Sequence, residues 1–163
     1  MSKWRPAEVC REEICALLKS AQQLTSGLDD EEIEKLGDIA VLEECDINCL
    51  LTREDERSRD LFIVAKGALS VEVHLSPKDT CTVSILKIRQ GGVAGELAFL
   101  DGGRRSASLR TIMSTTIIRL PQEELEALFD ANKGMGFTIM RNLAQLVTHR
   151  LRSTNFELRS RLP

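Results

Sequence analysis

The hydrophobic period of the chain changes twice, and this change constrains the fold more than any other feature. Apolar residues recur at helical spacing near both ends, whereas residues 37–120 contain short β-branched or alternating segments separated by turn-like clusters. Segments such as ALSVEVHL and CTVSILKI are typical of strands, and their near-regular spacing favours a sandwich, a barrel or a jelly roll. We therefore predict a β-rich middle region flanked by helices.

The first part of the chain is predicted to be helical. Apolar side chains recur at helical spacing in residues 7–20, and Pro6 is a favourable first helical residue. Asp29 and Glu32 have the spacing of a capping box, which indicates the start of a second short helix. We assign residues 1–36 to these N-terminal helices.

The last part of the chain returns to the helical period. Residues 121–163 contain one predicted helix with Pro121 at its start, followed by a long helix from Met135 to about Arg161. The expected order is therefore helix, helix, β-rich region, helix and long helix, within a single domain over residues 1–163.

Composition narrows the class of protein. With 163 residues, 42% hydrophobic and 29% charged, the chain suits one modest core. No segment approaches the roughly 20 apolar residues that span a membrane, and the first six residues lack the apolar part of a secretory signal. We therefore expect a cytoplasmic protein without membrane contact. Its two histidines, His74 and His149, lie far apart without an acid at ligand spacing, so neither a cofactor metal nor a histidine-based enzyme is expected.

The stretch GGVAGELAFLDGGRRSASLRT carries the candidate chemistry. GELAFL is too short for an ordinary helix, and a single helical turn presents free N–H groups to an anion. Arg105, returning on the next strand, adds a planar donor fork for two phosphate oxygens. Glu96 would repel a phosphate unless it accepts a hydrogen bond from a sugar hydroxyl. The pattern predicts a compact ligand with one phosphate and one sugar hydroxyl close together. The simpler alternative is that Arg105 is only the ion-pair partner of Glu96.

This stretch resembles the phosphate-binding cassette of cyclic nucleotide-binding domains, whose pattern runs Gly-Glu-Leu/Ile-Ala, a short turn, then Arg-Ser/Thr/Ala-Ala. The cassette occupies residues 95–108, and the upstream LFIVAKGALSVEV looks like the strand, glycine and strand of that family, with Gly67 as the glycine. The resemblance covers the chain from about Leu28 to Leu162. The proteins it resembles are the sensor domains of bacterial cAMP-dependent activators and of kinase regulatory subunits. It implies an eight-stranded β jelly roll, a double-stranded β-helix, over residues 37–120.

The resemblance also implies roles for single residues. Glu96 is expected to accept from the ribose 2′-hydroxyl, Arg105 to bind the exocyclic phosphate oxygens, and Ser106 to add its N–H or hydroxyl. Ala94 replaces a residue that is often aromatic or a large aliphatic, and Asp55 replaces a turn glycine although aspartate tolerates a positive φ less well. The cassette residues expected at the ligand are Gly95, Glu96, Leu97, Ala98, Arg105, Ser106 and Ala107.

The resemblance favours cAMP as the ligand but leaves cGMP open, because the Ser106 hydroxyl suits guanine in the syn form as well. We expect a regulatory sensor that moves its C-terminal helices and passes its signal to an unknown effector protein, without a catalytic or DNA-binding domain of its own. One alternative is a degenerate fold that only contacts other proteins. A metal-dependent jelly-roll enzyme would need several strand histidines, and His74 is the only one.

The long last helix carries two further predictions. LAQLVTHRLRSTN resembles the dimer helix of bacterial cAMP-dependent activators, which implies that Thr154 and Asn155 touch the adenine amino group. A homodimer is predicted because apolar and small residues recur with coiled-coil spacing; alternatively, the helix folds back on its own barrel in a monomer. We call these residues the seam: Met140, Ala144, Val147, Leu151, Thr154 and Leu158.

Charge is distributed unevenly along the chain. Residues 1–133 carry 17 basic and 24 acidic side chains, whereas residues 134–163 carry five arginines and only Glu157 as an acid. This basic end either complements the helix dipole or binds an acidic partner. Because the chain contains no predicted recognition helix, we expect no sequence-specific DNA binding.

Overall fold

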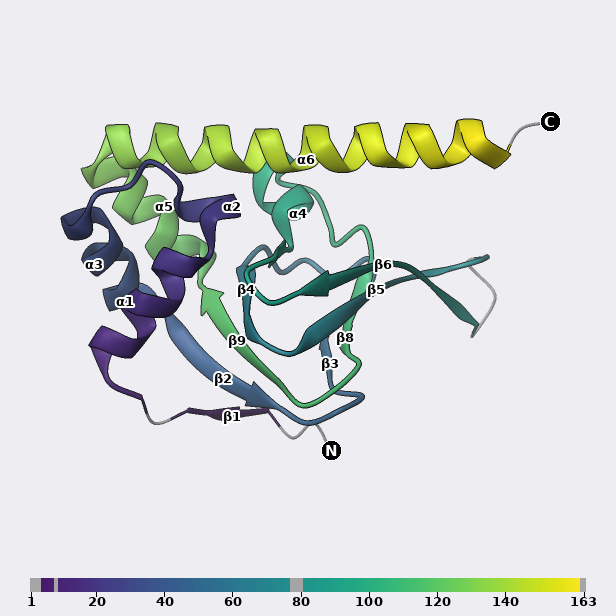
Figure 1. The fold of residues 1–163 in the computed structure, drawn as a ribbon, viewed down its shortest axis with the longest axis horizontal. Coiled ribbons are helices and arrows are strands. Elements are labelled where there is room, and N and C mark those ends of the chain that lie inside the picture. The colour runs from purple at the N-terminus through teal and green to yellow at the C-terminus, as the bar shows by residue number, and fades with distance from the viewer. Residues whose placement is uncertain (1–3, 8, 77–80, 162–163) are drawn as a thin grey trace.

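A computed structural model of the chain describes residues 4–7, 9–76 and 81–161. The predicted domain limits Met1 and Pro163 and the predicted end of the family resemblance, Leu162, lie outside the described residues. In chain order (Figure 1) the elements are β1 (Trp4–Pro6), α1 (Arg11–Ser20), α2 (Gln22–Thr25), α3 (Asp30–Ile39), β2 (Val41–Cys45), β3 (Leu50–Thr52), β4 (Leu61–Lys66), β5 (Ala68–His74), β6 (Thr82–Arg89), β7 (Val93–Ala94), α4 (Glu96–Asp101), β8 (Ser108–Thr111), β9 (Thr115–Leu120), α5 (Gln122–Ala131) and α6 (Lys133–Arg161).

The strands form two antiparallel sheets. Sheet A has the order β1-β2-β9-β4-β7, and sheet B has the order β3-β8-β5-β6. The predicted mainly β jelly-roll fold with flanking helices is confirmed, with two differences. The described residues form nine strands rather than eight, and the two sheets do not close into a barrel. One apolar core contains buried side chains from both sheets, among them Phe62, Val64, Leu69, Leu109 and Ile117.

The start of the chain differs from the prediction. Pro6 lies in β1, opposite Glu43 of β2, and the first helix begins at Arg11 rather than at residue 7. The physical reason is that proline lacks an N–H group, which suits an edge strand as well as a first helical turn. The capping box of the next predicted helix is confirmed, since the Asp29 side chain accepts from Glu32 N at 2.8 Å.

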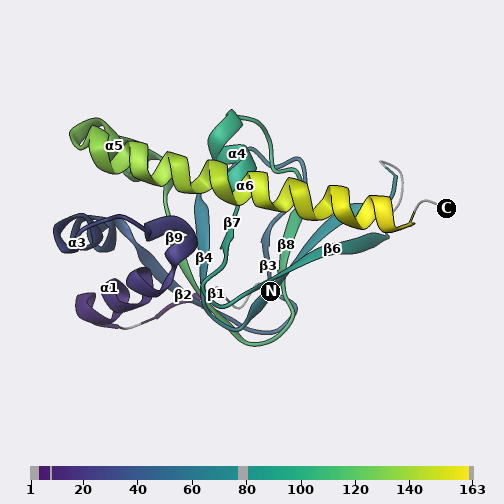
Figure 2. The same ribbon diagram turned by 45° about the horizontal axis from the view of Figure 1, so that its top comes forward.

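The helices gather at one end of the sheets. Figures 1 and 2 show α1, α3 and α5 beside one another at this end, while α6 runs from them along the whole molecule. A second apolar core joins these helices to the outer face of sheet A. Its fully buried members include Leu18, Leu36, Ile118, Leu125 and Ile139.

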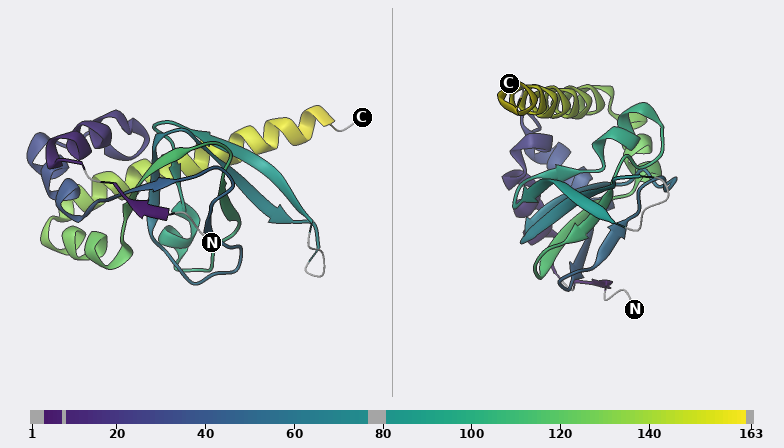
Figure 3. Two further views of the ribbon diagram at one scale, coloured as in Figure 1. Left: turned by 90° about the horizontal axis from the view of Figure 1, so that it is seen from below. Right: turned by 90° about the vertical axis from the view of Figure 1, so that its right-hand side faces the viewer.

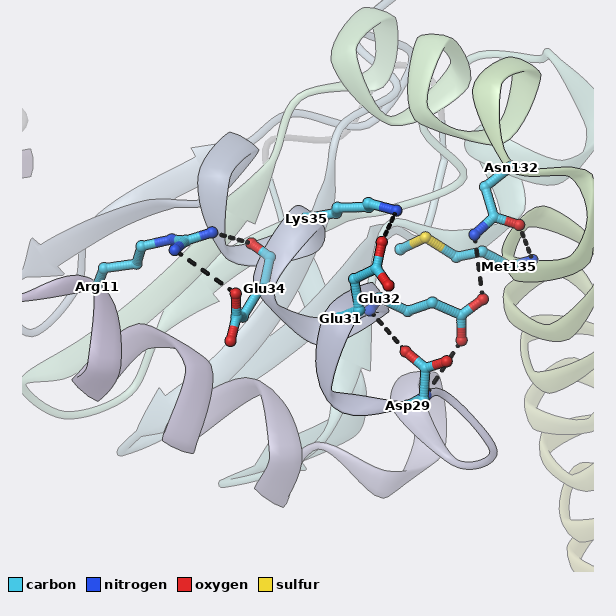
Figure 4. A network of polar contacts seen from close by, with 8 residues as sticks. All are labelled: Arg11, Asp29, Glu31, Glu32, Glu34, Lys35, Asn132 and Met135. Atoms are coloured by element: carbon cyan, nitrogen blue, oxygen red, sulfur yellow. Dashed lines mark hydrogen bonds and ion pairs between the residues drawn. The ribbon is translucent and has the colours of Figure 1, made fainter.

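The beginning of α6 is attached to α3 by a single asparagine (Figure 4). Asn132 Oδ1 accepts from Met135 N at 3.0 Å, and its Nδ2 donates to Glu32 Oε1 at 3.2 Å. The other oxygen of Glu32 accepts from Asp29 N at 3.1 Å and so completes the capping box of α3. One carboxylate therefore serves both the start of α3 and the start of α6.

The first half of α6 packs on the domain, whereas its second half leads away from the other helices and is exposed (Figure 3). Ile139, Leu143 and Leu146 are buried, but every residue over 151–160 is exposed. Buried Asn142 holds the packed half, because its Nδ2 donates to the carbonyl oxygens of Leu24 and Ser26 at 2.7 and 2.8 Å. Even α6 lacks the run of apolar residues needed to cross a bilayer, as does every other helix of the described residues.

We expect Asn142→Ala to lower the free energy of unfolding by about 1–3 kcal/mol, because the two carbonyl groups of the α2 turn lose their donor. Urea unfolding monitored by circular dichroism measures this change. Gln145→Ala is the matched control on an exposed position of the same helix, where we expect a change within about 0.5 kcal/mol. Equal effects of the two substitutions would contradict this role of Asn142.

Candidate functional site

The centre of the candidate site is α4, a helix of only six residues between β7 and β8. It is bounded by two glycines in the left-handed region, Gly95 with φ 84° and Gly102 with φ 70°. Phe99 fixes α4 against α5, since its ring meets Phe129 edge to face with centroids 6.2 Å apart. The predicted isolated helical turn is confirmed. As at the start of any helix, its first N–H groups have no carbonyl acceptor within the helix.

Arg105 is buried beside the start of α4, with 4% of its surface exposed. Its Nε donates to Ser58 Oγ at 3.0 Å, Nη1 to Gly95 O at 3.2 Å and Nη2 to Asp60 O at 2.9 Å. The guanidinium also lies over the ring of Phe62, 5.4 Å from its centroid. Burial lowers the pKa of Arg105 from its ordinary value, against the attraction of nearby acids. The side chain is thus held in one position by acceptors of the protein itself.

Glu96 is buried and is paired with an arginine that the sequence prediction missed. Arg150, on α6, donates from Nη1 to Glu96 Oε1 at 2.5 Å and from Nη2 to Val93 O at 2.6 Å. The alternative in which Arg105 pairs with Glu96 is therefore wrong. The sequence contained an indication of this role for Arg150. It follows Leu143 and Leu146 at helical spacing, so a cation takes the next position in a row of buried side chains.

The loop after β3 is tied to the cassette through backbone hydrogen bonds. Asp55 N donates to Arg105 O at 2.9 Å, and Arg105 N donates to Glu56 O at 2.9 Å. Asp55, at the position expected for a turn glycine, has φ 67° and so adopts the left-handed conformation that glycine favours. Arg104 donates from Nη1 to Asp55 O at 2.8 Å and supports this turn.

A cavity of about 1230 Å³ lies between the cassette, β6 and α6. The structure brings Thr154 to its wall, although the Thr154 hydroxyl donates to Arg150 O of its own helix at 3.0 Å. Asn155, about 100° further round the helix, is not among the lining residues of this cavity, and its contact with the ligand stays a prediction. The other predicted site residues all line the cavity: Gly95, Glu96, Leu97, Ala98, Arg105, Ser106 and Ala107.

The polar groups around the cavity suit a phosphorylated sugar. The start of α4 and the guanidinium of Arg105 supply N–H donors for an anion, and Glu96 supplies an acceptor for a hydroxyl. In the part of the chain that the structure describes, no three His, Cys, Asp or Glu side chains come together as metal ligands.

Comparison with known sequences identifies the type of domain that the cassette sequence resembles. The sequence profile described as "Cyclic nucleotide-binding domain" matches residues 42–132. Among curated proteins, the chain is 29% identical over 130 residues to glutaminase 1 of Bradyrhizobium diazoefficiens, an alignment that covers 80% of this chain. The chain spans only 20% of the length of that protein.

Solved structures share the fold. A cyclic nucleotide-binding domain from Methylobacillus flagellatus has a TM-score of 0.85 at 21% identity, and the alignment covers 98% of this chain and 90% of that one. The regulatory domain of Toxoplasma gondii PKA, solved with cAMP, has a TM-score of 0.72 at 20% identity, covering 85% and 50% of the two chains. At these identities the likeness is one of fold.

The two glycines that bound α4 provide a matched test of the cassette. A Cβ at Gly95 would lie 2.5 Å from Arg105 Nη1 and 2.8 Å from Asp60 O, whereas a Cβ at Gly102 would meet only Arg59, 3.8 Å away. We expect Gly102→Ala to lower the free energy of unfolding by about 1–2 kcal/mol through backbone strain alone. Gly95→Ala adds a clash and is expected to lower it by about 3 kcal/mol or more in urea unfolding. Equal losses would show that Arg105 does not pack against Gly95.

Proposed function

The chain belongs to the cyclic nucleotide-binding domain family, and on this premise we propose that it is a regulatory domain that binds cAMP in the cavity between α4 and α6. The single observation that carries this proposal is the pair of buried side chains, Glu96 and Arg105, at the start of the short α4 segment. Their opposite charges match the hydroxyl and the phosphate that a cyclic nucleotide holds close together.

Each polar part of the ligand has a candidate partner. Arg105 uses three of its five N–H groups on the protein, so two remain for the exocyclic phosphate oxygens among the described residues. The backbone N–H groups of Leu97 and Ala98 open α4 beside them. Glu96 accepts from the ribose hydroxyl through its carboxylate, and the base extends toward Thr154 on α6. The Toxoplasma domain with cAMP supports the choice of an adenine ligand, while cGMP remains the second candidate.

We propose that the signal leaves through α6. Arg150 joins this helix to Glu96, the same carboxylate that we assign to the ribose, so ligand binding and helix position share one acceptor. A nucleotide that changes the Glu96–Arg150 contact changes the relative energies of two α6 positions by its differential contacts. An effector protein would then recognise the C-terminal helices in one of these positions.

The first test is calorimetric titration with cAMP, cGMP and linear AMP. We expect tight binding of a cyclic nucleotide, and Arg105→Ala should weaken it by about 2–4 kcal/mol because a buried phosphate loses its charged partner. Arg104→Ala is the control, since that neighbouring side chain is half exposed and bonded to Asp55. Because Arg105 also holds the cassette, circular dichroism must show that the variant is folded. Unchanged cAMP affinity in Arg105→Ala would contradict the assignment.

A second candidate function is a protein-interaction module without a nucleotide. The observation in its favour is that Glu96 and Arg105 both have partners within the protein. Glu96 accepts from Arg150, and Arg105 donates to the carbonyl groups of Asp60 and Gly95. Both side chains can therefore be structural. The titration separates the two functions, because this second candidate gives no binding heat with either cyclic nucleotide.

We further propose a homodimer through the seam on α6. The support is that Leu151 and Leu158 are 59% and 57% exposed, so the second half of the helix presents uncovered apolar side chains, and Met140 in the first half is 37% exposed. A stripe of this width and spacing fits a partner helix. Because Leu151 and Leu158 also line the cavity, dimer contact and ligand binding would be coupled.

We expect Leu151→Glu to convert the dimer to a monomer and to weaken cAMP binding, because it places a charge in the seam and on the cavity wall. Light scattering at several protein concentrations measures the first effect and calorimetry the second. Gln145→Glu introduces the same charge change at an exposed position off the seam and should leave the dimer intact. A wild-type monomer both with and without cAMP would contradict the seam.

A further inference from the structure

One row of side chains crosses all four strands of sheet B and faces the cavity. Thr52 of β3 is paired with Leu109 of β8, Leu109 with Val71 of β5, and Val71 with Leu86 of β6. Residues directly opposite in neighbouring strands project to the same face of a sheet. All four belong to the residues that line the cavity, and three of them are aliphatic. Thr52 is thus the one polar side chain in this row.

The hydroxyl of Thr52 has an unusual environment. Thr52 is only 3% exposed, and within the described residues its Oγ1 is buried without a hydrogen-bond partner. Other buried hydroxyls of sheet B are bonded: Ser70 Oγ donates to Ser84 Oγ at 2.7 Å, and Thr111 Oγ1 donates to Asp46 O at 2.6 Å. Native proteins rarely leave a buried hydroxyl unbonded, so each such group requires a specific explanation.

The position of Thr52 relative to the cassette suggests that explanation. The residues that follow it are tied to the cassette strand, since Glu54 N donates to Ser108 Oγ at 2.9 Å and Asp55 N donates to Arg105 O at 2.9 Å. Thr52 therefore lies at the end of the row that is nearest the proposed phosphate and ribose groups. Rotation about its Cα–Cβ bond moves the hydroxyl from one staggered position to another without movement of the strand.

From the row and the unbonded hydroxyl, we infer that Thr52 is a further ligand contact, whose hydroxyl hydrogen-bonds to the bound cyclic nucleotide. This inference rests on the proposed function and adds a residue outside the cassette to it. Leu109, Val71 and Leu86 offer only apolar contact to the ligand on this wall. Within this row, only the Thr52 side chain can form a hydrogen bond to the ligand, because its hydroxyl both donates and accepts.

The test compares Thr52→Val with Thr52→Ser in calorimetric titrations with cAMP and cGMP. Valine has the shape of threonine without the hydroxyl, so we expect the affinity of Thr52→Val for the preferred nucleotide to fall roughly 3- to 10-fold. Serine keeps the hydroxyl and is expected to retain affinity within about 2-fold of wild type. The free protein supplies a second readout: Thr52→Val should keep or raise the melting temperature, because it removes an unbonded hydroxyl from the interior.

The outcomes separate this inference from the proposed function. If wild type binds a cyclic nucleotide and Thr52→Val binds it equally well, the inference is wrong and the proposed function stands. If Thr52→Ser loses as much affinity as Thr52→Val, keeping the hydroxyl does not preserve binding, which also overturns the inference. Absence of binding heat for wild type with both nucleotides overturns the proposed function and the inference together.

Discussion

The buried guanidinium of Arg105 is the interaction on which the candidate site depends. It joins the start of α4, through Gly95 O, to the start of β4, through Asp60 O. The carboxylate of Asp60 in turn accepts from Arg119 Nη1 at 3.2 Å and from Gln122 N at 3.0 Å at the start of α5. The cassette, the sheet and the first C-terminal helix therefore meet at two residues, Arg105 and Asp60.

In the described residues, hydrogen bonds attach the long helix to the domain from its start as far as Arg150. Asn132 holds its start, Asn142 holds its body, and Arg150 marks the end of the attached part by its bond to Glu96. Beyond Arg150, the exposed seam residues Leu151, Thr154 and Leu158 also line the cavity. Under the proposed function, the Arg150–Glu96 contact is the point at which a bound nucleotide would influence the helix.

The fold was predictable where the pattern is local. Alternating strand segments, the Asp29 capping box and the glycine-bounded turn of α4 were all identified, because a few neighbouring residues determine each of them. Pro6 shows where such reasoning fails: a residue without an N–H group fits a helix start and an edge strand equally, and pairing with β2 decided between them. The predicted number of eight strands was too low, in part because the pairing of β1 with β2 was not foreseen.

The sequence by itself determined the cassette, since the order of glycine, acid, small residues and arginine encodes both the short helix and its charges. Only the tertiary structure decided which groups meet across the chain. The pairing of Glu96 with Arg150 depends on how α6 lies on the sheets, and the position of Thr52 at the cavity depends on how β3 aligns with β8. Packing of the whole core sets these alignments, and a local sequence pattern does not identify the partner of a side chain.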